Sequence, residues 1–517
     1  MSNGLLVENT EPGVFAIINA GQVARPIQQQ PTSTFFVVGY SPWGPVGAPR
    51  VLTSWTDYVR QFGGFDDNSF TDKAAYIFFN FFPGQTMWMS RAVGATPVKG
   101  TLTLQDQGVG ANQKPTLSVT AKYPSTRADI SVAIAAGTNA NTFKLTIASV
   151  FLNRTEAFDN LIVDQPSLDL VNQRSLIVNL ANLLSANAAP INLPAILAAT
   201  PLAGGTDDFA HINDSSFVGT DDGLGNRTGL QCFNDASFGD GQVAIPGITT
   251  PAVRAALIAH GNQYYRLALI DPPFGSSKQD LLTIRQGIGS WEAAMYWPWV
   301  QMLDFSKNTG VTRFYAPSAF AAGACALVDR TIGPHKAPAN VQIPNALGVE
   351  LAPSGQTQTD DNTRAFLNGN SINVICPLPE QGVKIYGARV MQGADPRVQM
   401  VHQARLLNLF YYSAIAGYQW APFSVVDPQG RLFRDLIATG NAFLINFWRA
   451  GALFSDTPGK PAGAFVVIAD SSNNPPEELE NQRVHVQWGV HLSPTAEMII
   501  INIDNVPLFQ PLSVLSQ

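Results

Sequence analysis

The hydrophobic pattern near the N-terminus predicts short strands followed by helices. A Pro-Gly pair precedes an apolar run at 14–18, and a second apolar run covers 34–39; both have the length of a strand. A helix is predicted over 55–62, because Gly63-Gly64 closes its pattern, and another over 72–82. The N-terminal part of the chain therefore mixes strands with helices.

The pattern changes between about 100 and 205, where period-two alternation becomes common. Residues 117–121 and 143–147 alternate apolar with polar side chains, as strands with one buried face do. Thr, Ser, Val, Ala and Asn dominate, and aromatic residues are scarce. With a helix expected around 171–184, this region is predicted to be a separate β-rich insert.

Apolar strands alternate with helices from 207 to 389, which is the pattern of an α/β domain. Buried strands are expected at 266–270 and 295–303, and a helix at 251–261 with proline at its start. These elements predict a central α/β domain.

The C-terminal part is predicted to contain two helices and three strands. The first helix, 401–418, is amphipathic, and the second begins at Asp427-Pro428 and runs to about 451. Of the strands, the first is apolar throughout and is predicted to be central in its sheet, whereas the second alternates and so has one buried face. The three strands are expected at 464–469, 484–490 and 498–503.

Composition and charge narrow the range of functions. A length of 517 residues indicates about three domains, and 45% hydrophobic residues provide for a large core. Only 13% of residues are charged, which suits a surface largely covered by copies of the same chain, although a large apolar enzyme has a similar composition. A net charge of −7 argues against nucleic-acid binding through bulk electrostatics.

The cysteines and the chain start give no sign of secretion. Cys232, Cys325 and Cys376 lie far apart without a CxxC pair, so we expect neither a disulfide framework nor a zinc site. This cysteine usage fits a reducing compartment best. The first residues lack the basic segment and long apolar core of a signal peptide. The most apolar stretch, 176–203, is interrupted by asparagines and prolines, so no membrane span is expected.

Motifs for catalysis are absent from the sequence. It contains no GxxxxGK(S/T) phosphate loop, no GxGxxG, no HExxH and no GxSxG. Its six histidines lack metal-ligand spacing, and the acidic pairs Asp207-Asp208 and Asp221-Asp222 suit turns better than a cation site. The loop 333–338 contains His335 beside Lys336, but its glycine and two prolines favour a rigid turn. We therefore expect no catalytic, cofactor-binding or metal-binding residue, and no enzymatic activity.

Short motifs lie in a distinctive order along most of the chain. The most specific is Gly-Pro-His-Lys-Ala-Pro-Ala-Asn at 333–340, followed by Tyr-Gly-Ala-Arg at 386–389. Together these segments resemble the contractile tail sheath family of bacteriophages and related injection machines, with Tyr386 in place of the family's usual tryptophan. The region 100–205, which varies in the family, is not covered. Further matching segments are 11–15, 32–39, 43–45, 52–64, 78–84, 87–93, 296–300, 316–318, 367–373, 464–470 and 489–497.

The resemblance implies a structural protein without a cofactor. Members of the family assemble as stacked six-subunit rings in a helical tube around an inner tail tube, and the sheath contracts to drive the tube through the target cell envelope. The expected partners are other copies of the chain, the inner tail tube protein, and baseplate and tail terminator proteins, without direct nucleic-acid contact or membrane insertion. The expected location is the virion tail, assembled in the bacterial host cytoplasm for genome ejection.

The resemblance also implies that neighbouring subunits exchange strands through both chain ends. An added strand on an exposed sheet edge is a known mode of association. The second C-terminal helix resembles the region near the tube, where Arg431 and Arg434 could meet an acidic surface. The expected arm residues are Val14, Phe15, Ala16, Ile17 and Ile18 at the N-terminus and Met498, Ile499, Ile500, Ile501 and Ile503 at the C-terminus; the receiving sheet would contain Phe465, Val467, Val484, Val486 and Trp488.

The predicted fold is an α/β (α+β) multidomain protein. Its core domain, with mixed sheet and helices, combines N- and C-terminal segments beside a central α/β domain and a β-rich insert. Two other functions remain open: the sheath of a type VI-like or extracellular contractile injection system, and, from another class, an intracellular α/β hydrolase. The predicted limits are 1–22 for the N-terminal exchange arm, 23–99 for the N-terminal part of the core, 100–205 for an outward insert, 206–390 for the central domain, 391–496 for the C-terminal core with the receiving sheet, and 497–517 for the C-terminal exchange arm.

Overall fold

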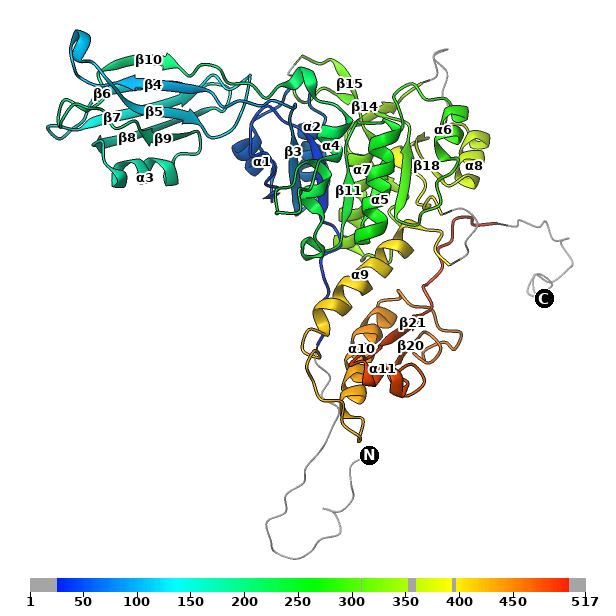
Figure 1. Ribbon diagram of the computed structural model, residues 1–517. Helices are drawn as coiled ribbons and strands as arrows, with labels where there is room; N and C mark the ends of the chain where they lie inside the picture. The colour runs from blue at the N-terminus through cyan, green and yellow to red at the C-terminus, as the bar shows by residue number, and fades with distance from the viewer. Residues whose placement is uncertain (1–25, 308, 352–358, 393–396, 502–517) are drawn as a thin grey trace, which may run out of the picture. The chain divides into compact units, whose positions relative to one another are not determined.

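The computed structural model describes residues 26–307, 309–351, 359–392 and 397–501. They fall into two compact units, each described by itself. The larger unit covers 30–412, and the smaller unit combines 26–29 with 413–501. Strands and helices alternate along both (Figure 1), so the predicted α/β multidomain fold is confirmed.

A nine-stranded sheet forms the centre of the larger unit. Its order is β16-β19-β18-β13-β12-β11-β1-β3-β2, and the six strands from β18 to β3 are parallel. All residues of β1 and β13 are buried, as the continuously apolar runs require of strands covered on both faces. The strands are β1 (Phe35–Tyr40), β2 (Arg50–Leu52), β3 (Met87–Ala92), β11 (Gln242–Ala244), β12 (Leu267–Ile270), β13 (Ala293–Trp297), β16 (Val341–Gln342), β18 (Ile372–Leu378) and β19 (Gly382–Ile385).

Strand β1 joins segments that are distant in the sequence. It pairs in parallel with β3 on one side and with β11 on the other. Residues 35–92 and 242–385 therefore share one sheet. The sequence analysis did not predict this grouping, because it assigned 23–99 to a core shared with the C-terminal part. Parallel pairing between distant segments leaves no local signal, because each strand needs only an apolar run of its own.

Helices cover both faces of this sheet. Phe35 and Val37 point into a core with α7 (Pro317–Thr331) and α2 (Thr71–Tyr76), whereas Phe36 and Val38 point the other way. A π-helical segment, Ile77–Phe81, continues α2, so the predicted helix at 72–82 is present in two forms. Further helices of the unit are α1 (Trp55–Phe62), α4 (Asp214–Val218), α5 (Pro251–Tyr264), α6 (Lys278–Arg285) and α8 (Asp361–Gly369).

Residues 101–201 build two further sheets around a core that also includes Trp43. One has the order β10-β6-β7-β8 and the other β4-β5-β9. The chain enters and leaves through a paired stem, in which Val98 bridges Thr206 and Thr101 bridges Ala203. The elements are β4 (Thr101–Gln105), β5 (Pro115–Ala121), β6 (Ser131–Ala136), β7 (Phe143–Ser149), β8 (Arg154–Leu161), α3 (Gln165–Arg174), β9 (Val178–Asn182) and β10 (Leu197–Pro201).

Two predicted elements differ from the structure. The helix expected at 171–184 is wrong in its second half, because 178–182 pairs with β5 as a strand. The strand expected at 295–303 is divided around Pro298, which has no N–H to donate. Its second part, β14 (Val300–Leu303), belongs to a three-stranded antiparallel sheet with β15 (Thr312–Tyr315) and β17 (Ala346–Val349).

The smaller unit pairs helices with a two-stranded antiparallel sheet. Helix α9 (Val401–Gly417) belongs to the larger unit up to Tyr412 and to the smaller unit from Ser413. The second predicted helix starts at Arg431 instead of Asp427, whose carboxylate accepts the Arg431 backbone N–H at 3.1 Å. The elements are α10 (Arg431–Arg449), β20 (Phe465–Ile468), α11 (Pro476–Glu480) and β21 (Gln487–Val490).

Candidate assembly surface

One face of the β20–β21 sheet packs on α10. Val467 lies opposite Trp488 in the register, and Val467 is buried. The Trp488 ring lies 5.7 Å from that of Phe443, and its indole N–H donates to the Tyr418 hydroxyl at 3.2 Å. These contacts fix the orientation of the sheet on its helix.

Gly440 permits this close packing. A Cβ at this position would lie 2.7 Å from the Tyr418 hydroxyl, 3.0 Å from Trp488 Nε1 and 3.1 Å from Val467 Cγ1. Such distances are shorter than van der Waals contact, so any side chain would separate α10 from the sheet. The glycine is therefore a packing requirement of the predicted receiving sheet that the sequence analysis did not identify.

The opposite face and the edges of this sheet are open. Among the described residues, β20 pairs only with β21, although the apolar run at 464–469 predicted a central strand. The Val466 side chain, which points away from α10, is 50% exposed. The chain at 452–454 runs beside 491–493, where the Phe454 N–H donates to the His491 carbonyl at 2.8 Å. The edge of β20 thus carries a row of backbone groups without a strand beside it in this part of the chain.

The receiving sheet is shorter than predicted. Val484 and Val486 precede β21 and pack instead with Leu432 and Leu436 of α10. Asn474 replaces the strand partner here: its side-chain oxygen accepts the His485 N–H at 2.6 Å, and its amide donates to the His485 carbonyl at 3.0 Å. The polar run around Asn474 is visible in the sequence, but nothing in the sequence indicates that its side chain bonds the His485 backbone.

The predicted exchange arms lie largely at or beyond the limits of the description. The N-terminal arm, 14–18, and Ile503 are outside the described residues. Met498, Ile499, Ile500 and Ile501 are described, belong to no strand, and are 76–83% exposed. Four successive large apolar side chains in water are typical of a segment that is covered in a complex.

Arg431 and Arg434 are exposed in the first turns of α10, while Leu432 and Leu436 are buried on its other side. Within 413–501, neither arginine has an ion-pair partner at 4.0 Å or less. Their charges add to the positive end of the helix dipole, so this end of α10 attracts anionic groups.

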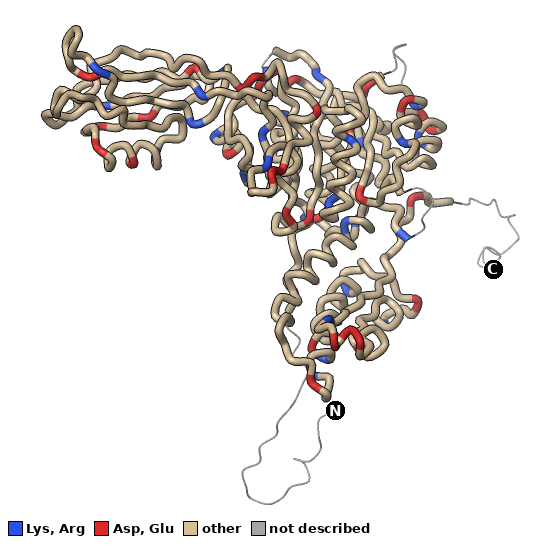
Figure 2. Tube along the Cα trace, viewed as in Figure 1, with Lys and Arg blue, Asp and Glu red and all other residues tan. Residues whose placement is uncertain are grey.

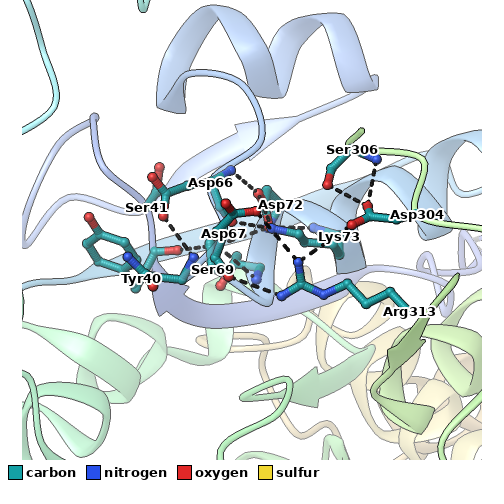
Figure 3. Close-up of polar contacts among 12 residues, drawn as sticks. Tyr40, Ser41, Asp66, Asp67, Ser69, Asp72, Lys73, Asp304, Ser306 and Arg313 are labelled. Atoms are coloured by element: carbon teal, nitrogen blue, oxygen red, sulfur yellow. Dashed lines mark hydrogen bonds and ion pairs between the residues drawn. The ribbon is translucent and has the colours of Figure 1, made fainter. Parts of the chain in front are cut away.

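A buried polar cluster in the larger unit has a structural role. Lys73 pairs with Asp72 at 3.0 Å and also donates to the Asp66 carbonyl (Figure 3). Burial raises the pKa of Asp72 to about 6. In the same loop Asp67 lies 2.9 Å from Lys307, and Lys307 lowers its pKa. Each cation here has an acidic partner, so the cluster joins elements and offers no free acid–base group.

The ionisable side chains of the described residues form no metal-binding cluster. No group of three or more His, Cys, Asp or Glu side chains among them could hold a metal ion. His260 is buried between Asn234 and Arg266, and burial lowers its pKa to about 3. Acidic and basic positions are interspersed along the described trace (Figure 2). No helix in this part of the chain is long and apolar enough to cross a bilayer.

Comparison with known proteins gives a consistent result. Residues 241–391 match the phage tail sheath protein central domain. A prophage major tail sheath protein of Pseudomonas aeruginosa (strain UCBPP-PA14) is 26% identical over 290 residues, or 55% of this chain and 70% of that protein. The sheath tail protein Lin1278 of Listeria innocua has a TM-score of 0.60 at 12% identity, covering 86% of this chain and 90% of that chain. The contracted sheath complex of the extracellular contractile injection system PVC has a TM-score of 0.55 at 15% identity, covering 96% of this chain and 98% of that chain.

Proposed function

We propose, from the premise that this chain belongs to the contractile tail sheath family, that it is the sheath subunit of a contractile injection tail. Copies of the chain polymerise as stacked hexameric rings in a helical tube around the inner tail tube. Contraction of that polymer drives the tube through the envelope of the target cell. We favour a bacteriophage-type tail for the particle, since a prophage protein and a phage protein are among the sequence relatives.

The observation that carries the proposal is the incomplete sheet of the smaller unit. Strand β20 has the sequence of a central strand and the position of an edge strand. The same chain exposes four consecutive apolar residues at 498–501. An edge without a strand beside it and an exposed apolar segment are complementary features, and they suit strand addition between copies.

Strand addition would bind neighbouring subunits firmly. We propose that 14–18 of one neighbour and 498–503 of another extend the β20–β21 sheet. Each added strand forms about four backbone hydrogen bonds worth ~0.5–1.5 kcal/mol apiece. Burial of each large apolar side chain adds about 1.5–3 kcal/mol. Arms held in this way stay paired while the subunit bodies move during contraction.

The proposed partners follow from this role. The sheath contacts itself, the inner tail tube, the baseplate and the tail terminator, and it needs neither nucleic acid nor cofactor. We propose that it is assembled in the bacterial host cytoplasm and resides in the tail. The protein catalyses no reaction, and the energy of contraction is stored when the sheath is assembled.

Paired serine substitutions in the C-terminal arm test the proposal. Ile499→Ser with Ile501→Ser removes two exposed apolar side chains, so the melting temperature of the unassembled chain should stay within about 2 °C. Electron microscopy should show that sheath formation is lost. Val109→Ser, an equally exposed apolar position in a loop of the insert region, is the matched control and should assemble normally. Intact sheath from the double variant would refute the role of this arm.

A second experiment addresses the N-terminal arm. Removal of residues 1–20 should leave a folded chain that cannot form sheath, because 14–18 would be buried in another subunit. The competing interpretation makes 14–18 a strand of its own domain, and the truncation would then lower the melting temperature sharply. Assembly and melting temperature measured on one protein distinguish the two outcomes.

A further inference from the structure

Beneath the first half of α9, within the larger unit, the carboxyl groups of Asp240 and Asp329 interact with the guanidinium of Arg405, and a third carboxyl group, that of Glu292, interacts with Asp240. Arg405 of α9, Asp240 before β11 and Glu292 before β13 are all at most 2% exposed. Asp329, in the last turns of α7, completes the group. Asp240 interacts electrostatically with the other three, so the four side chains form one cluster.

Only some of the polar atoms in this cluster form hydrogen bonds. Arg405 Nη2 donates to the Asp329 carboxylate and to the Thr32 carbonyl at 3.2 Å. On the next turn of α9, the Asn408 amide donates to Glu292 Oε2 at 2.8 Å. These contacts, made by side chains three residues apart on one face, hold α9 against the amino ends of the parallel strands.

The remaining polar atoms are buried without hydrogen-bond partners among the described residues. They are Asp240 Oδ2, Asp329 Oδ1, and Arg405 Nε and Nη1. Within the described part of the chain, the Asp240 carboxylate accepts one hydrogen bond, from the Gly241 N–H at 2.6 Å. Arg405 is hydrogen-bonded to Asp329 and only interacts with Asp240 electrostatically, and burial outweighs that attraction. Because an ionised carboxylate is costly to bury, Asp240 and Glu292 are stable here chiefly as neutral acids.

Several other titratable groups lie near the cluster. His402 is buried on the preceding turn of α9. The guanidinium of Arg266 interacts with Asp240 but donates to the carbonyls of Phe233, Asp235 and Gly239. Burial raises the pKa of Cys325 to about 11 and lowers that of His335. Tyr296 and Tyr412 also lie near the cluster, and burial raises the pKa of each.

We infer that residues 401–412 of α9 are seated on the larger unit by a proton-dependent contact, which holds while Asp240 and Glu292 carry protons and loosens when they ionise. Every element of the contact lies between 30 and 412, so the inference does not depend on the proposed sheath function. It assigns a conformational role to three acids and one arginine that take no part in the assembly surface.

The direction of the pH effect follows from linkage. Burial raises the pKa of Glu292 to about 8 and raises that of Asp240 well above its ordinary value. When α9 lifts away, water reaches these carboxyls and their pKa values return toward about 4. Seating is therefore strongest below about pH 4, weakens as the pH rises, and for Glu292 reaches its limit near pH 8. Each titrating group contributes up to about tenfold per pH unit in the opening equilibrium.

Amide hydrogen exchange of the full-length chain tests the inference. Protection factors of 401–412, corrected for intrinsic exchange, should fall at least tenfold between pH 6 and pH 8.5. Those of α5, in the same unit, provide the internal reference. Glu292→Gln keeps an acceptor for Asn408 and removes a titrating group, so it should reduce the fall by at least threefold. Glu480→Gln, at an exposed position of α11, is the control and should leave the fall unchanged.

Two further variants cover the case in which Glu292→Gln does not fold. Asp240→Asn should flatten the pH dependence in the same direction, and Asn408→Asp should steepen it by placing another carboxyl against Glu292. The inference is overturned if protection of 401–412 in the wild type does not change with pH. It is also overturned if Glu292→Gln and Asp240→Asn both retain the wild-type slope.

Discussion

The nine-stranded sheet and the two-stranded sheet show what one type of apolar strand becomes in two settings. In the larger unit β1 has a parallel neighbour on each side and helices on both faces, and every residue of it is buried. In the smaller unit β20 has a similarly apolar sequence but one neighbour, and Val466 is half exposed. The first sheet is complete within its own chain. The second has a sequence suited to partners that its own described residues do not supply.

The first prediction concerns a substitution that disrupts the packing of the nine-stranded sheet. Phe36 of β1 is fully buried, lies 5.3 Å from the Phe233 ring, and has the Arg266 guanidinium 4.5 Å above its ring. Phe36→Ala should cost the larger unit about 3–5 kcal/mol in the free energy of unfolding, because it leaves a cavity that the sheet cannot close. Urea unfolding measures this loss. Phe423→Ala removes a fully exposed ring and should change the free energy by less than about 0.5 kcal/mol.

The second prediction breaks the packing of the incomplete sheet. Gly440→Val should destabilise the smaller unit by about 3 kcal/mol, near the upper end for an overpacked site. Trp488 packs at that point, and its fluorescence reports on the unfolding of this unit. The fluorescence of the eight other tryptophans is measured in a Trp488→Phe variant and subtracted. The neighbouring exposed substitution Asn441→Ala should be neutral or slightly stabilising, since alanine favours helix. Equal effects of both substitutions would contradict the packing role of Gly440.

The third prediction concerns the asparagine that ends the receiving sheet. Asn474→Ala removes both hydrogen bonds to the His485 backbone and should cost about 1–3 kcal/mol, because a buried N–H and carbonyl lose their partner. Asn474→Asp keeps an acceptor for the His485 N–H but loses the donor, so its cost should be intermediate. Thermal unfolding of the three proteins ranks them. A fully stable Asn474→Ala variant would show that the loop is held by other contacts.

The smallest effect on stability is expected at the exposed end of α10. Arg431→Glu with Arg434→Glu should change the free energy of unfolding by less than about 0.5 kcal/mol. If this face meets an acidic tube, the double variant should load poorly onto tubes in co-sedimentation, most clearly at low salt where screening is weakest. Lys460→Glu with Arg483→Glu changes the net charge equally at other exposed positions of the unit. Equal loading of the two variants would contradict a tube contact through Arg431 and Arg434.

Local signals in the sequence identify some elements closely. Ser54 and Gly63 bracket α1: the Ser54 hydroxyl accepts the Asp57 N–H at 3.1 Å, and Gly63 adopts a positive φ of 86°. The helix predicted over 55–62 is therefore confirmed to the residue. The strand predicted at 34–39 is β1, shifted by one residue.

Elements that depend on distant partners are harder to predict. Val178 and Leu180 could belong to a helix or a strand, and pairing with β5, about sixty residues earlier in the chain, decides for the strand. The place of β1 between β3 and β11 depends on segments separated by the whole insert. An apolar run sufficed to predict the strand at 464–469, most of which is β20. Gly440 and Asn474 were missed because their roles exist only once α10 and β21 are in contact.

The stem of the insert region suggests how such proteins diversify. Because Val98 bridges Thr206 and Thr101 bridges Ala203, the chain enters and leaves the insert region at neighbouring points. A unit of any length with adjacent termini can join at these points, since doubling a closed loop adds only about 0.6 kcal/mol of chain entropy. The stem is therefore a position at which another domain can be inserted. A protein displayed there would be repeated once per subunit along the whole polymer, so this junction is a natural place to attach enzymes or antigens at high density.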